Sequence, residues 1–486
     1  MKKHAYLLIV GLIVGCFSDG FSGLRSCQLN VAGAERISSN GITDILIDGS
    51  NVWVATGQGL VRTTDGGSTW DLWGQEDGIG KGSVTAICAG HDMIWIATGF
   101  DTTTDLGSYD AGGGVGYSRD SENWVWYSQP VDSQNVEDYD PTTTNIQNLT
   151  YDIAITDDAI WIASFGGGFR RSTNLGRTWT PVTVDGNPFS SLDYLAHRAF
   201  AVMYDGSNLW AGSADGVHKS EDGGESWVTF NRQNQTSPIS GNFVVALANQ
   251  EWEDRSFVWA ASVEALDSIE VRGVSMTEDG GLTWKTMLEG LFAHNFAFDG
   301  PDAYVATDKG LYKSQDFGDT WAVFPNIVDD ESGEEIYSDE ITCAAVDETG
   351  VLWVGSLDGL ARSTDGGATW TIFRAFETPG ESGVLETYAY PNPFSPLRHN
   401  TRGGDGYVRF QYAVDKPSKI TVKIYDFGMN LVQIIADNKD RSSAGDYSEV
   451  WDGKNELGDM VANGVYFYQV IRSGHASLWG KVMVVN

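Results

Sequence analysis

The amino-acid sequence predicts an all-β chain, a seven-bladed β-propeller followed by a small β-sandwich. A short sequence motif, which consists of a strand, a Gly turn, an acidic turn and a Trp, recurs about seven times. The copies are about 50 residues apart, which is the length of a four-stranded propeller blade. The composition combines 12% aromatic residues and 58 Gly with only 12 Pro, as is typical of short strands joined by tight turns.

The acidic turn reads Ser/Thr-x-Asp-x-Gly-x-Thr/Ser-Trp. A sixth copy at residues 172–179 has Asn174 in place of the Asp, and a degenerate seventh contains Asp120 and Trp124. Because the first and last Trp of the series lie 300 residues apart over six intervals, seven blades follow. The five clean copies are residues 63–70, 220–227, 277–284, 314–321 and 363–370.

The first repeat shows how one blade is built. Residues 42–47 alternate as a strand, the Asp-Gly turn at 48–51 reverses the chain, and residues 52–56 return. Asp-Gly is a strong hairpin signal because Gly adopts positive φ without steric cost. A Gly turn leads into 60–64 and the acidic turn into 69–73, so four strands result, as a blade requires.

We expect the acidic turns to be structural. The Asp carboxylate can accept hydrogen bonds from N–H groups of its own loop, the Ser/Thr hydroxyl adds another bond, and the Trp buries its apolar face against the adjacent blade. A residue that repeats with one local task is a poor candidate for a catalyst. The turn residues are Asp65, Asp120, Asn174, Asp222, Asp279, Asp316 and Asp365, with Trp70, Trp179, Trp227, Trp284, Trp321 and Trp370.

These turns resemble the Asp-box (BNR) repeats of sialidases, sortilin-type receptors, xyloglucanase-type glycoside hydrolases and photosystem II assembly-factor propellers. The resemblance covers residues 41 to about 376. It implies the propeller fold, whereas the functions of those proteins are unrelated to one another. The resemblance therefore does not indicate a function for this chain.

The chain is strongly acidic: 31 Lys plus Arg against 66 Asp plus Glu leave a formal net charge of −35. This charge opposes nucleic acid and anionic membrane surfaces as partners. An acidic exterior of this kind is typical of a solvated extracellular protein. Alternatively, the negative charge serves to attract cations or basic surfaces.

The N-terminus has the pattern of an export signal. Lys2 and Lys3 precede an apolar run at residues 5–14, which is too short to span a bilayer. The run ends at Ile13-Val14-Gly15-Cys16, which resembles a bacterial lipobox and would make Cys16 the lipidated first residue. Ordinary cleavage nearby, with Cys16 discarded, is the alternative.

Cysteine usage predicts neither a disulfide framework nor a metal site. Cys88 and Cys343 fall in predicted inner strands of blades that are not neighbours, so we expect buried thiols. There is no CxxC motif and no Cys/His cluster with metal spacing. No cofactor is expected, although Ca²⁺ is possible on acidic loops.

One face of the predicted propeller is rich in long loops. In a four-stranded blade, the second-to-third turns and the links between blades share one face, while the acidic turns lie on the other. Loops of this length usually have a function, so we predict that this loop face is the binding side. The long segments are residues 99–113, 128–147, 184–197, 263–272 and 325–339.

The loop face offers mainly acidic and aromatic residues. Carboxylates beside Tyr suit a carbohydrate or Ca²⁺, because rings stack on sugar faces and oxygen ligands satisfy calcium. Solvated acidic loops are the alternative. His197, Arg198 and His294 fall at the starts of inner strands, where they would contact a ligand or satisfy strand ends. The candidate ligand-binding residues are Tyr109, Asp110, Tyr139, Asp140, Tyr194, His197, Arg198 and His294.

No catalytic residue can be assigned. A sialidase needs three Arg, a Tyr/Glu pair and an Asp, and its usual Arg-Ile-Pro motif is matched here only by Arg36-Ile37-Ser38. A xyloglucanase-like hydrolase needs two opposed carboxylates across a cleft, which the acidic face permits without identifying a pair. Nucleophile-elbow, zinc-peptidase and phosphate-loop motifs are absent.

The tail has the pattern of a separate small β-sandwich. Residues 377–389 include Thr378-Pro379-Gly380 and are interpreted as a linker. Alternating apolar residues in the following short runs would fill the space between two sheets. The predicted strands are residues 407–414, 420–425, 431–435, 465–471 and 481–485.

Five spaced motifs in this tail resemble FlgD Ig-like modules and type IX secretion C-terminal sorting domains of exported bacterial proteins. The resemblance implies sorting to, or attachment at, the outer surface, and a spacer is the alternative. The motifs are Tyr390-Pro391-Asn392-Pro393-Phe394, Ile424-Tyr425-Asp426-Phe427-Gly428, Trp451-Asp452-Gly453, Gly458 and Gly464-Val465-Tyr466-Phe467-Tyr468.

We therefore expect an exported, cell-surface or secreted binding protein that recognises a glycan or protein and is held at the bacterial outer membrane by sorting or a lipid anchor. The alternatives are a secreted glycoside hydrolase with paired carboxylates on the loop face and an assembly factor for a membrane complex. The expected segments are a signal and N-terminal segment at 1–34, the propeller at 35–376, the linker at 377–389 and the FlgD-like Ig module at 390–486.

Overall fold

The computed structural model describes residues 33–105, 107–264 and 270–486. Two compact units are present: a propeller unit of residues 33–336 with Glu340–Arg374, and a sandwich unit of Tyr337–Asp339 with Ala375–Asn486. Cys16 and the predicted export signal lie outside the described residues. Within the described ranges, no helix is long and apolar enough to cross a membrane.

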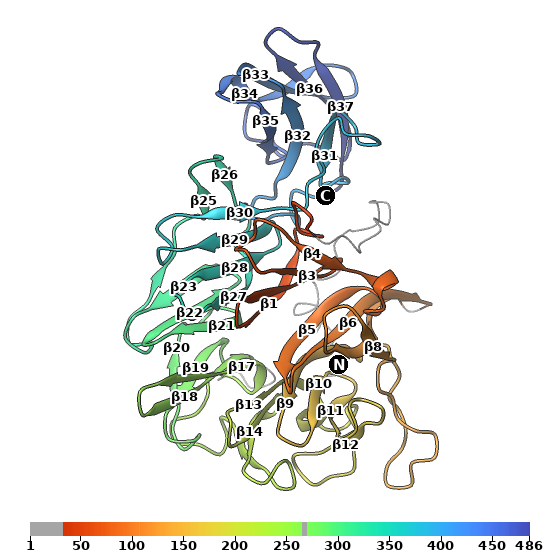
Figure 1. The fold of residues 1–486 in the computed structure, drawn as a ribbon, viewed down its shortest axis with the longest axis vertical. Coiled ribbons are helices and arrows are strands. Elements are labelled where there is room, and N and C mark those ends of the chain that lie inside the picture. Colours follow the sequence, from red (N-terminus) through yellow and green to blue (C-terminus); the bar gives the residue numbers. More distant parts are fainter. Residues whose placement is uncertain (1–32, 106, 265–269) are drawn as a thin grey trace. The chain divides into compact units, whose positions relative to one another are not determined.

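The propeller unit contains seven four-stranded antiparallel sheets, so the predicted seven-bladed propeller is confirmed (Figure 1). Each blade is one continuous stretch of chain, and its strands follow in sequence order across the sheet. The blades are, in chain order: β1 (Ile42–Asp48), β2 (Asn51–Thr56), β3 (Gly59–Thr63) and β4 (Asp71–Trp73); β5 (Ser83–Gly90), β6 (Met93–Thr104), β7 (Gly107–Ser118) and β8 (Trp124–Tyr127); β9 (Thr150–Ile155), β10 (Ile160–Ser164), β11 (Gly168–Ser172) and β12 (Thr180–Val182); β13 (Ala199–Tyr204), β14 (Leu209–Ser213), β15 (Gly216–Ser220) and β16 (Val228–Phe230); β17 (Phe243–Trp252), β18 (Arg255–Val263), β19 (Gly273–Thr277) and β20 (Lys285–Met287); β21 (Ala293–Asp299), β22 (Asp302–Thr307), β23 (Gly310–Ser314) and β24 (Ala322–Val323); β27 (Ile341–Val346), β28 (Leu352–Ser356), β29 (Gly359–Ser363) and β30 (Thr371–Phe373).

Two of the predicted long loops have regular structure. The segment 99–113 is not an irregular loop, because it prolongs β6 and β7 into a long hairpin with Asp101 opposite Asp110. The segment 325–339 contains a short hairpin of β25 (Val328–Asp329) and β26 (Glu334–Glu335). Two 3₁₀ turns, η1 (Gln75–Asp77) and η2 (Leu195–His197), complete the described elements of the propeller unit.

The acidic turns form a local hydrogen-bond cage. In the first blade, Asp65 Oδ1 accepts from the Thr69 amide at 2.9 Å and Oδ2 accepts from the Thr69 hydroxyl at 2.7 Å. The Thr63 hydroxyl donates to Asp65 Oδ1 at 2.8 Å and accepts from the Gly67 amide. These bonds, first those from Thr69, hold the pKa of Asp65 down at about 2. Asn174 takes the same position in the third blade, where its Oδ1 accepts from the Thr178 amide at 3.0 Å.

The Trp of each turn packs against the preceding blade. Trp227 meets Trp161 edge-on with ring centroids 6.3 Å apart, and Trp321 meets Trp259 in the same way at 6.2 Å. Trp70 of the first blade contacts Trp353 of the last at 6.3 Å. The ring is therefore closed by packing of two complete blades, and among the described strands none is exchanged between sheets.

The innermost strand of every blade is its first strand. Thr43 Oγ1 of β1 donates to the Val84 carbonyl of β5, and Thr85 Oγ1 of β5 donates to the Thr150 carbonyl of β9, both at 2.7 Å. Cys88 of β5 and Cys343 of β27 are free thiols, half-buried and buried respectively. Burial raises the pKa of the Cys88 thiol to about 12, so this thiol stays protonated.

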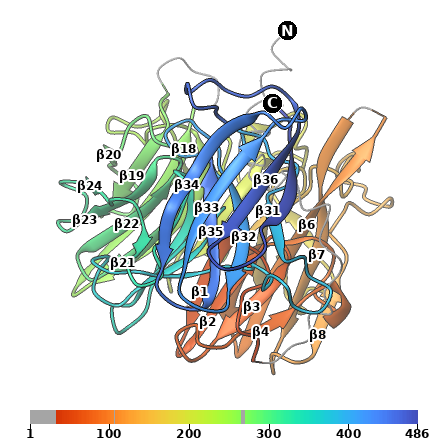
Figure 2. The same cartoon turned by 90° about the horizontal axis from the view of Figure 1, so that it is seen from above.

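The sandwich unit packs a three-stranded sheet, β31-β32-β35, against a four-stranded sheet, β34-β33-β36-β37. Figure 2 shows β34, β33 and β36 side by side. The predicted strands are present, and β31 and β35 are additional ones that the sequence analysis missed. Their bounds are β31 (Thr387–Tyr390), β32 (Val408–Val414), β33 (Ser418–Tyr425), β34 (Leu431–Arg441), β35 (Gly445–Trp451), β36 (Gly464–Arg472) and β37 (Leu478–Val484).

The Tyr390–Phe394 motif covers the outer edge of β37. The Phe394 amide donates to the Met483 carbonyl at 2.7 Å, and the Val485 amide donates back to the Phe394 carbonyl at 2.9 Å. The Asn392 side chain accepts from the Met483 amide at 3.0 Å. A strand edge that would otherwise be open for pairing is thus satisfied within the chain.

Candidate binding face

The loop face is a physical surface of the propeller unit. In several blades, the second-to-third turn bonds to the residues just before an inner strand. The Gly57 amide donates to the Gly41 carbonyl at 2.9 Å, and the Ala214 amide donates to the Arg198 carbonyl at 3.1 Å. Links and turns therefore meet around the starts of the inner strands, and the acidic turns lie at the other ends of the strands.

A β-bulge occurs near the start of all seven inner strands. Each bulge inserts one unpaired residue and re-aims its side chain, a feature that the sequence analysis missed. Three of the bulged residues are Thr, and their hydroxyls bond to the next blade. The bulged residues are Thr43, Thr85, Tyr151, Phe200, Val245, His294 and Thr342.

Three of the remaining bulged residues, Tyr151, Phe200 and Val245, form an apolar arc over blades 3 to 5, and the fourth is the polar His294 of blade 6. Phe200 is buried, and its ring lies 5.4 Å from Tyr151, 5.8 Å from Phe165 and 4.4 Å from Phe243. Tyr151, Phe165 and Val245 are half-buried. At the loop face, blades 7, 1 and 2 thus carry hydrogen-bonded hydroxyls, whereas blades 3 to 5 carry apolar side chains.

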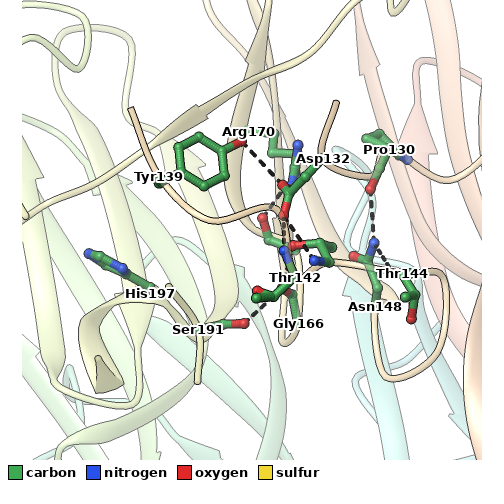
Figure 3. A network of polar contacts seen from close by, with 12 residues as sticks. Pro130, Asp132, Tyr139, Thr142, Thr144, Asn148, Gly166, Arg170, Ser191 and His197 are labelled. Carbon is green, nitrogen blue, oxygen red and sulfur yellow. Dashed lines mark hydrogen bonds and ion pairs between the residues drawn. The ribbon is translucent and has the colours of Figure 1, made fainter. Parts of the chain in front are cut away.

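A buried ion pair anchors the link between blades 2 and 3. Arg170 of β11 donates to Asp132 Oδ1 at 2.7 Å, and both side chains are almost completely buried (Figure 3). Asp132 Oδ2 accepts from the Thr143 amide at 2.9 Å, and the Tyr139 hydroxyl donates to Oδ1 at 3.2 Å. Burial opposes ionisation of Asp132, but the bonds from Arg170 and Thr143 outweigh it, so its pKa lies below the usual value.

Sequence reasoning missed the role of Arg170, although a signal was present. Arg170 occupies the third position of the third strand, which is buried in this blade. Most other blades place an uncharged residue there. The corresponding residues are Val61, Gly116, His218, Ser275, Tyr312 and Ala361.

A second anchor holds the link between blades 3 and 4. His197 Nδ1 accepts from the Ser190 amide at 3.0 Å, so Nε2 carries the ring proton and donates to Asp185 Oδ1 at 2.9 Å. Burial opposes ionisation of Asp185, but hydrogen bonds from Asn187 and His197 outweigh it and lower its pKa. His197 itself is buried.

Phe189 brings three of the predicted residues together. Its ring stacks on His197 at 5.7 Å and meets Tyr139 edge-on at 5.6 Å, while Tyr194 lies 4.9 Å from His197. Figure 3 shows Tyr139 and His197 one above the other on the left of the view, beside the Asp132–Arg170 pair. The sequence analysis missed Phe189, since nothing in a single sequence distinguishes it from other loop aromatics.

The other predicted residues lie apart from this cluster. Arg198 donates to the carbonyls of Ser191 and Leu192, so it braces its own loop. Asp140 is exposed. His294 lies in blade 6 with Nε2 3.5 Å from Glu340, and burial lowers its pKa.

Tyr109 and Asp110 lie on the prolonged hairpin of blade 2. Asp110 is half-buried and directly opposite the exposed Asp101. Burial, together with the hydrogen bond and the charge of Asp101, raises the pKa of Asp110 to about 7. Asp110 therefore keeps its proton to a much higher pH than an ordinary carboxyl does.

The described residues hold no group of three or more His, Cys, Asp or Glu placed to bind a metal ion. Two surface hollows lie on the acidic-turn side of the propeller. One, of about 390 Å³, is lined by Trp161, Arg171 and Glu225, and the other, of about 410 Å³, is lined by Asp48 and Arg119 among others. Neither hollow includes a predicted ligand-binding residue.

Comparison with known proteins identifies the C-terminal domain. Residues 398–474 match the FlgD Ig-like domain family. No curated protein matches the chain. The chain is thus a seven-bladed β-propeller protein with a C-terminal FlgD Ig-like domain.

Solved structures resemble the chain in fold. PorZ, an essential bacterial surface component of the type IX secretion system of Porphyromonas gingivalis, is 16% identical, with 90% of this chain and 64% of that chain covered and a TM-score of 0.42. The GH74 xyloglucanase from Xanthomonas campestris is 13% identical, with 93% and 67% covered and a TM-score of 0.51. YCF48 from Cyanidioschyzon merolae is 14% identical, with 70% and 97% covered and a TM-score of 0.43. This chain therefore spans less than two thirds of the PorZ chain, and likeness at these identities concerns the fold alone.

Proposed function

We propose that this protein is exported, at the cell surface or secreted, and that the loop face of its propeller recognises a glycan or a protein. The observation that supports this proposal is the anchoring of the loops. The Asp132–Arg170 and Asp185–His197 pairs hold two long links in place from below. A surface ordered before binding loses less conformational entropy when a ligand arrives.

The loop face carries the chemistry that suits such a ligand. Tyr194 is 36% exposed and Asp140 is exposed, whereas Tyr109 and Asp110 are half-buried. Rings of this kind stack on sugar faces, and carboxylates accept bonds from sugar hydroxyls or from basic side chains. Tyr139, His197 and Arg198 act as positioning residues, because their polar atoms bond within the loops.

A glycan array and calorimetry with purified protein test the proposal. We expect binding to at least one glycan class or protein ligand, and about a tenfold loss for Tyr194→Ala, because a half-exposed stacking ring contributes roughly that much. Leu282→Ser is the matched control, since Leu282 is 71% exposed on the acidic turn of blade 5. Equal losses of affinity in the two variants, or unchanged affinity in Tyr194→Ala, would count against the loop face as the binding site.

One observation favours the glycoside hydrolase alternative. Asp110, with a pKa of about 7, faces Asp101 across the hairpin, so Asp110 can hold a proton close to neutral pH, as a general acid must. A glycosidase combines such an acid with a second carboxylate on the other side of the bond that it cleaves. Reducing-end release from a panel of polysaccharides, lost in Asp110→Asn, would establish the enzyme and displace the binding role.

We further propose that the FlgD Ig-like domain serves export or surface attachment at the bacterial outer membrane by acting as a sorting domain. A lipid on Cys16 is the alternative means of attachment. Surface labelling of cells that produce the full chain, a chain without residues 390–486, or Cys16→Ser separates these routes. Loss of surface protein on deletion supports sorting, whereas loss in Cys16→Ser supports lipidation. Unchanged labelling in both variants would contradict attachment by either route.

A further inference from the structure

The outward side of the four-stranded sheet in the sandwich unit is unusually apolar. Buried residues of β33, β36 and β37 face the core, so alternate residues face outward. Among these, Val465, Trp479 and Met483 are 36%, 49% and 47% exposed. Tyr425 lies opposite Phe467, and its ring is 5.6 Å from Trp479.

The same surface continues onto a turn tip. Phe427 and Met429, in the turn between β33 and β34, are 80% and 52% exposed, and the Phe427 ring lies 6.2 Å from Phe467. The turn is well held, since Asp426 Oδ1 accepts from the Asn430 amide at 2.8 Å. The exposed side chains of Phe427 and Met429 therefore project from a fixed backbone.

Cations lie among these apolar side chains. The outward positions of β33, β36 and β37 include the half-buried Lys423 and the exposed Lys481, and no Asp or Glu occupies an outward position of these three strands. The acidity of the chain is elsewhere. Residues 33–374 hold 17 Lys plus Arg against 52 Asp plus Glu, whereas residues 375–486 hold 11 against 13.

We propose that this apolar face, formed by Tyr425, Phe427, Met429, Phe467, Trp479 and Met483, docks the sandwich unit on a lipid surface with anionic headgroups. Aromatic rings favour the headgroup level of a bilayer, and lysines beside them attract lipid phosphates. A contiguous apolar surface of this kind marks an interaction site in a soluble domain.

The arrangement suits a lipid surface better than a protein partner. Protein interfaces place their apolar groups in a central core and their charges at the rim. Here the most exposed ring, Phe427, is at a turn tip, and Lys481 pairs directly with Phe467 across the sheet. The apolar side chains can insert below the layer of lipid phosphates while the lysine ammonium groups stay beside the phosphates.

The inference rests on the proposed attachment role, and vesicle co-sedimentation tests it. The full chain carries Cys16→Ser in every version, because a lipid on Cys16 would bind vesicles by itself. Vesicles contain phosphatidylcholine alone or with about one third phosphatidylglycerol, a content that gives a clearly negative surface. We expect binding to the anionic vesicles that weakens as salt rises.

The double variant Phe427→Ser/Met429→Ser should bind about tenfold more weakly or worse, because two inserted apolar side chains are lost. Both side chains are exposed, so thermal unfolding should stay unchanged. Leu282→Ser, on the propeller, should bind vesicles like the parent. Lys423→Gln/Lys481→Gln should reduce the preference for anionic vesicles.

Absence of binding to either kind of vesicle, or full binding by Phe427→Ser/Met429→Ser, overturns the inference. A protein would then be the expected partner of the apolar face. The two failures are separable from each other. If vesicle binding fails while deletion of residues 390–486 still removes the protein from the cell surface, the attachment role stands and only the lipid contact is wrong.

Discussion

Thr342 Oγ1 donates a 2.7 Å hydrogen bond to the carbonyl oxygen of Ile42, and so joins two inner strands whose residues are 300 positions apart. The Arg362 guanidinium donates to the Gly66 carbonyl across the same boundary. The bond from Thr342 has the same form as those from Thr43 and Thr85 between other blades. The closing boundary is thus built like an ordinary contact between neighbouring blades.

Replacement of Thr342 by Val tests this closure. Valine has the shape of threonine but lacks the hydroxyl, so the Ile42 carbonyl loses its side-chain donor. We therefore expect a loss of about 1 kcal/mol in the free energy of unfolding. Urea unfolding followed by Trp fluorescence measures it. Thr85→Val, inside the ring, should lose a similar amount, and a much larger effect of Thr342→Val would show that closure is a weak point.

Asp152 should make stability depend on pH. Its Oδ2 accepts from the Val202 amide of the next blade at 2.9 Å, but burial, with a smaller contribution from the charge of Asp44, raises its pKa to about 7. The folded pKa lies above the unfolded value, so the cost of the charged form is absent below about pH 4 and grows until about pH 7. Asp152→Asn should therefore stabilise the fold by about 2 kcal/mol at pH 8 and by little at pH 4.

Asn295 provides the matched reverse variant. It occupies the position after the bulge in blade 6, as Asp152 does in blade 3, and its Oδ1 accepts from the Ala344 amide at 3.1 Å. Asn295→Asp should destabilise the fold at pH 8 more than at pH 4. Thermal unfolding at the two pH values measures both variants, and pH-independent shifts would contradict the assignment.

Removal of Arg170 should be costly because it strands a buried carboxylate. Arg170 and Asp132 are 2% and 0% exposed in their side chains. We expect Arg170→Met to lose about 3–5 kcal/mol, and the double variant with Asp132→Asn to lose less than the sum of the single changes. A double-mutant cycle by denaturant unfolding measures the coupling. Additive losses would show that the pair does not act as a unit.

Trp70 should contribute more to stability than other tryptophans of the series. It is fully buried against Trp353 and Phe373, whereas Trp227 is half-buried. Trp70→Ala should cost about 3–5 kcal/mol because it leaves a large cavity between the first and last blades. Trp227→Ala should cost less. The free energy of unfolding of each variant checks the order, and a reversed order would contradict the burial argument.

Much of the fold could be predicted because its signals are local. An acidic turn closes its hydrogen bonds within a few residues, as Thr69 does with Asp65, so it can be recognised without knowledge of the rest of the chain. The strands β31 and β35 were missed because short runs such as Thr387–Tyr390 lack a clear alternation of buried and exposed residues.

The candidate site was less accessible to the same reasoning. The predicted Tyr139, Tyr194 and His197 do come together, but through Phe189. Asp132 finds Arg170 at a separation of 38 residues. Pairings at such distances follow from the positions of whole blades, which no local pattern encodes.

The sequence by itself determined the number and order of the blades, the acidic turns and the presence of a second β domain, because repeat spacing and turn chemistry are written in neighbouring residues. Only the tertiary structure decided that Thr342 meets Ile42, that all seven inner strands carry a bulge, and which loop carboxylates hold the loops in place. The physical reason is that radial packing brings residues from different blades into contact, and those contacts determine which polar groups are buried and paired.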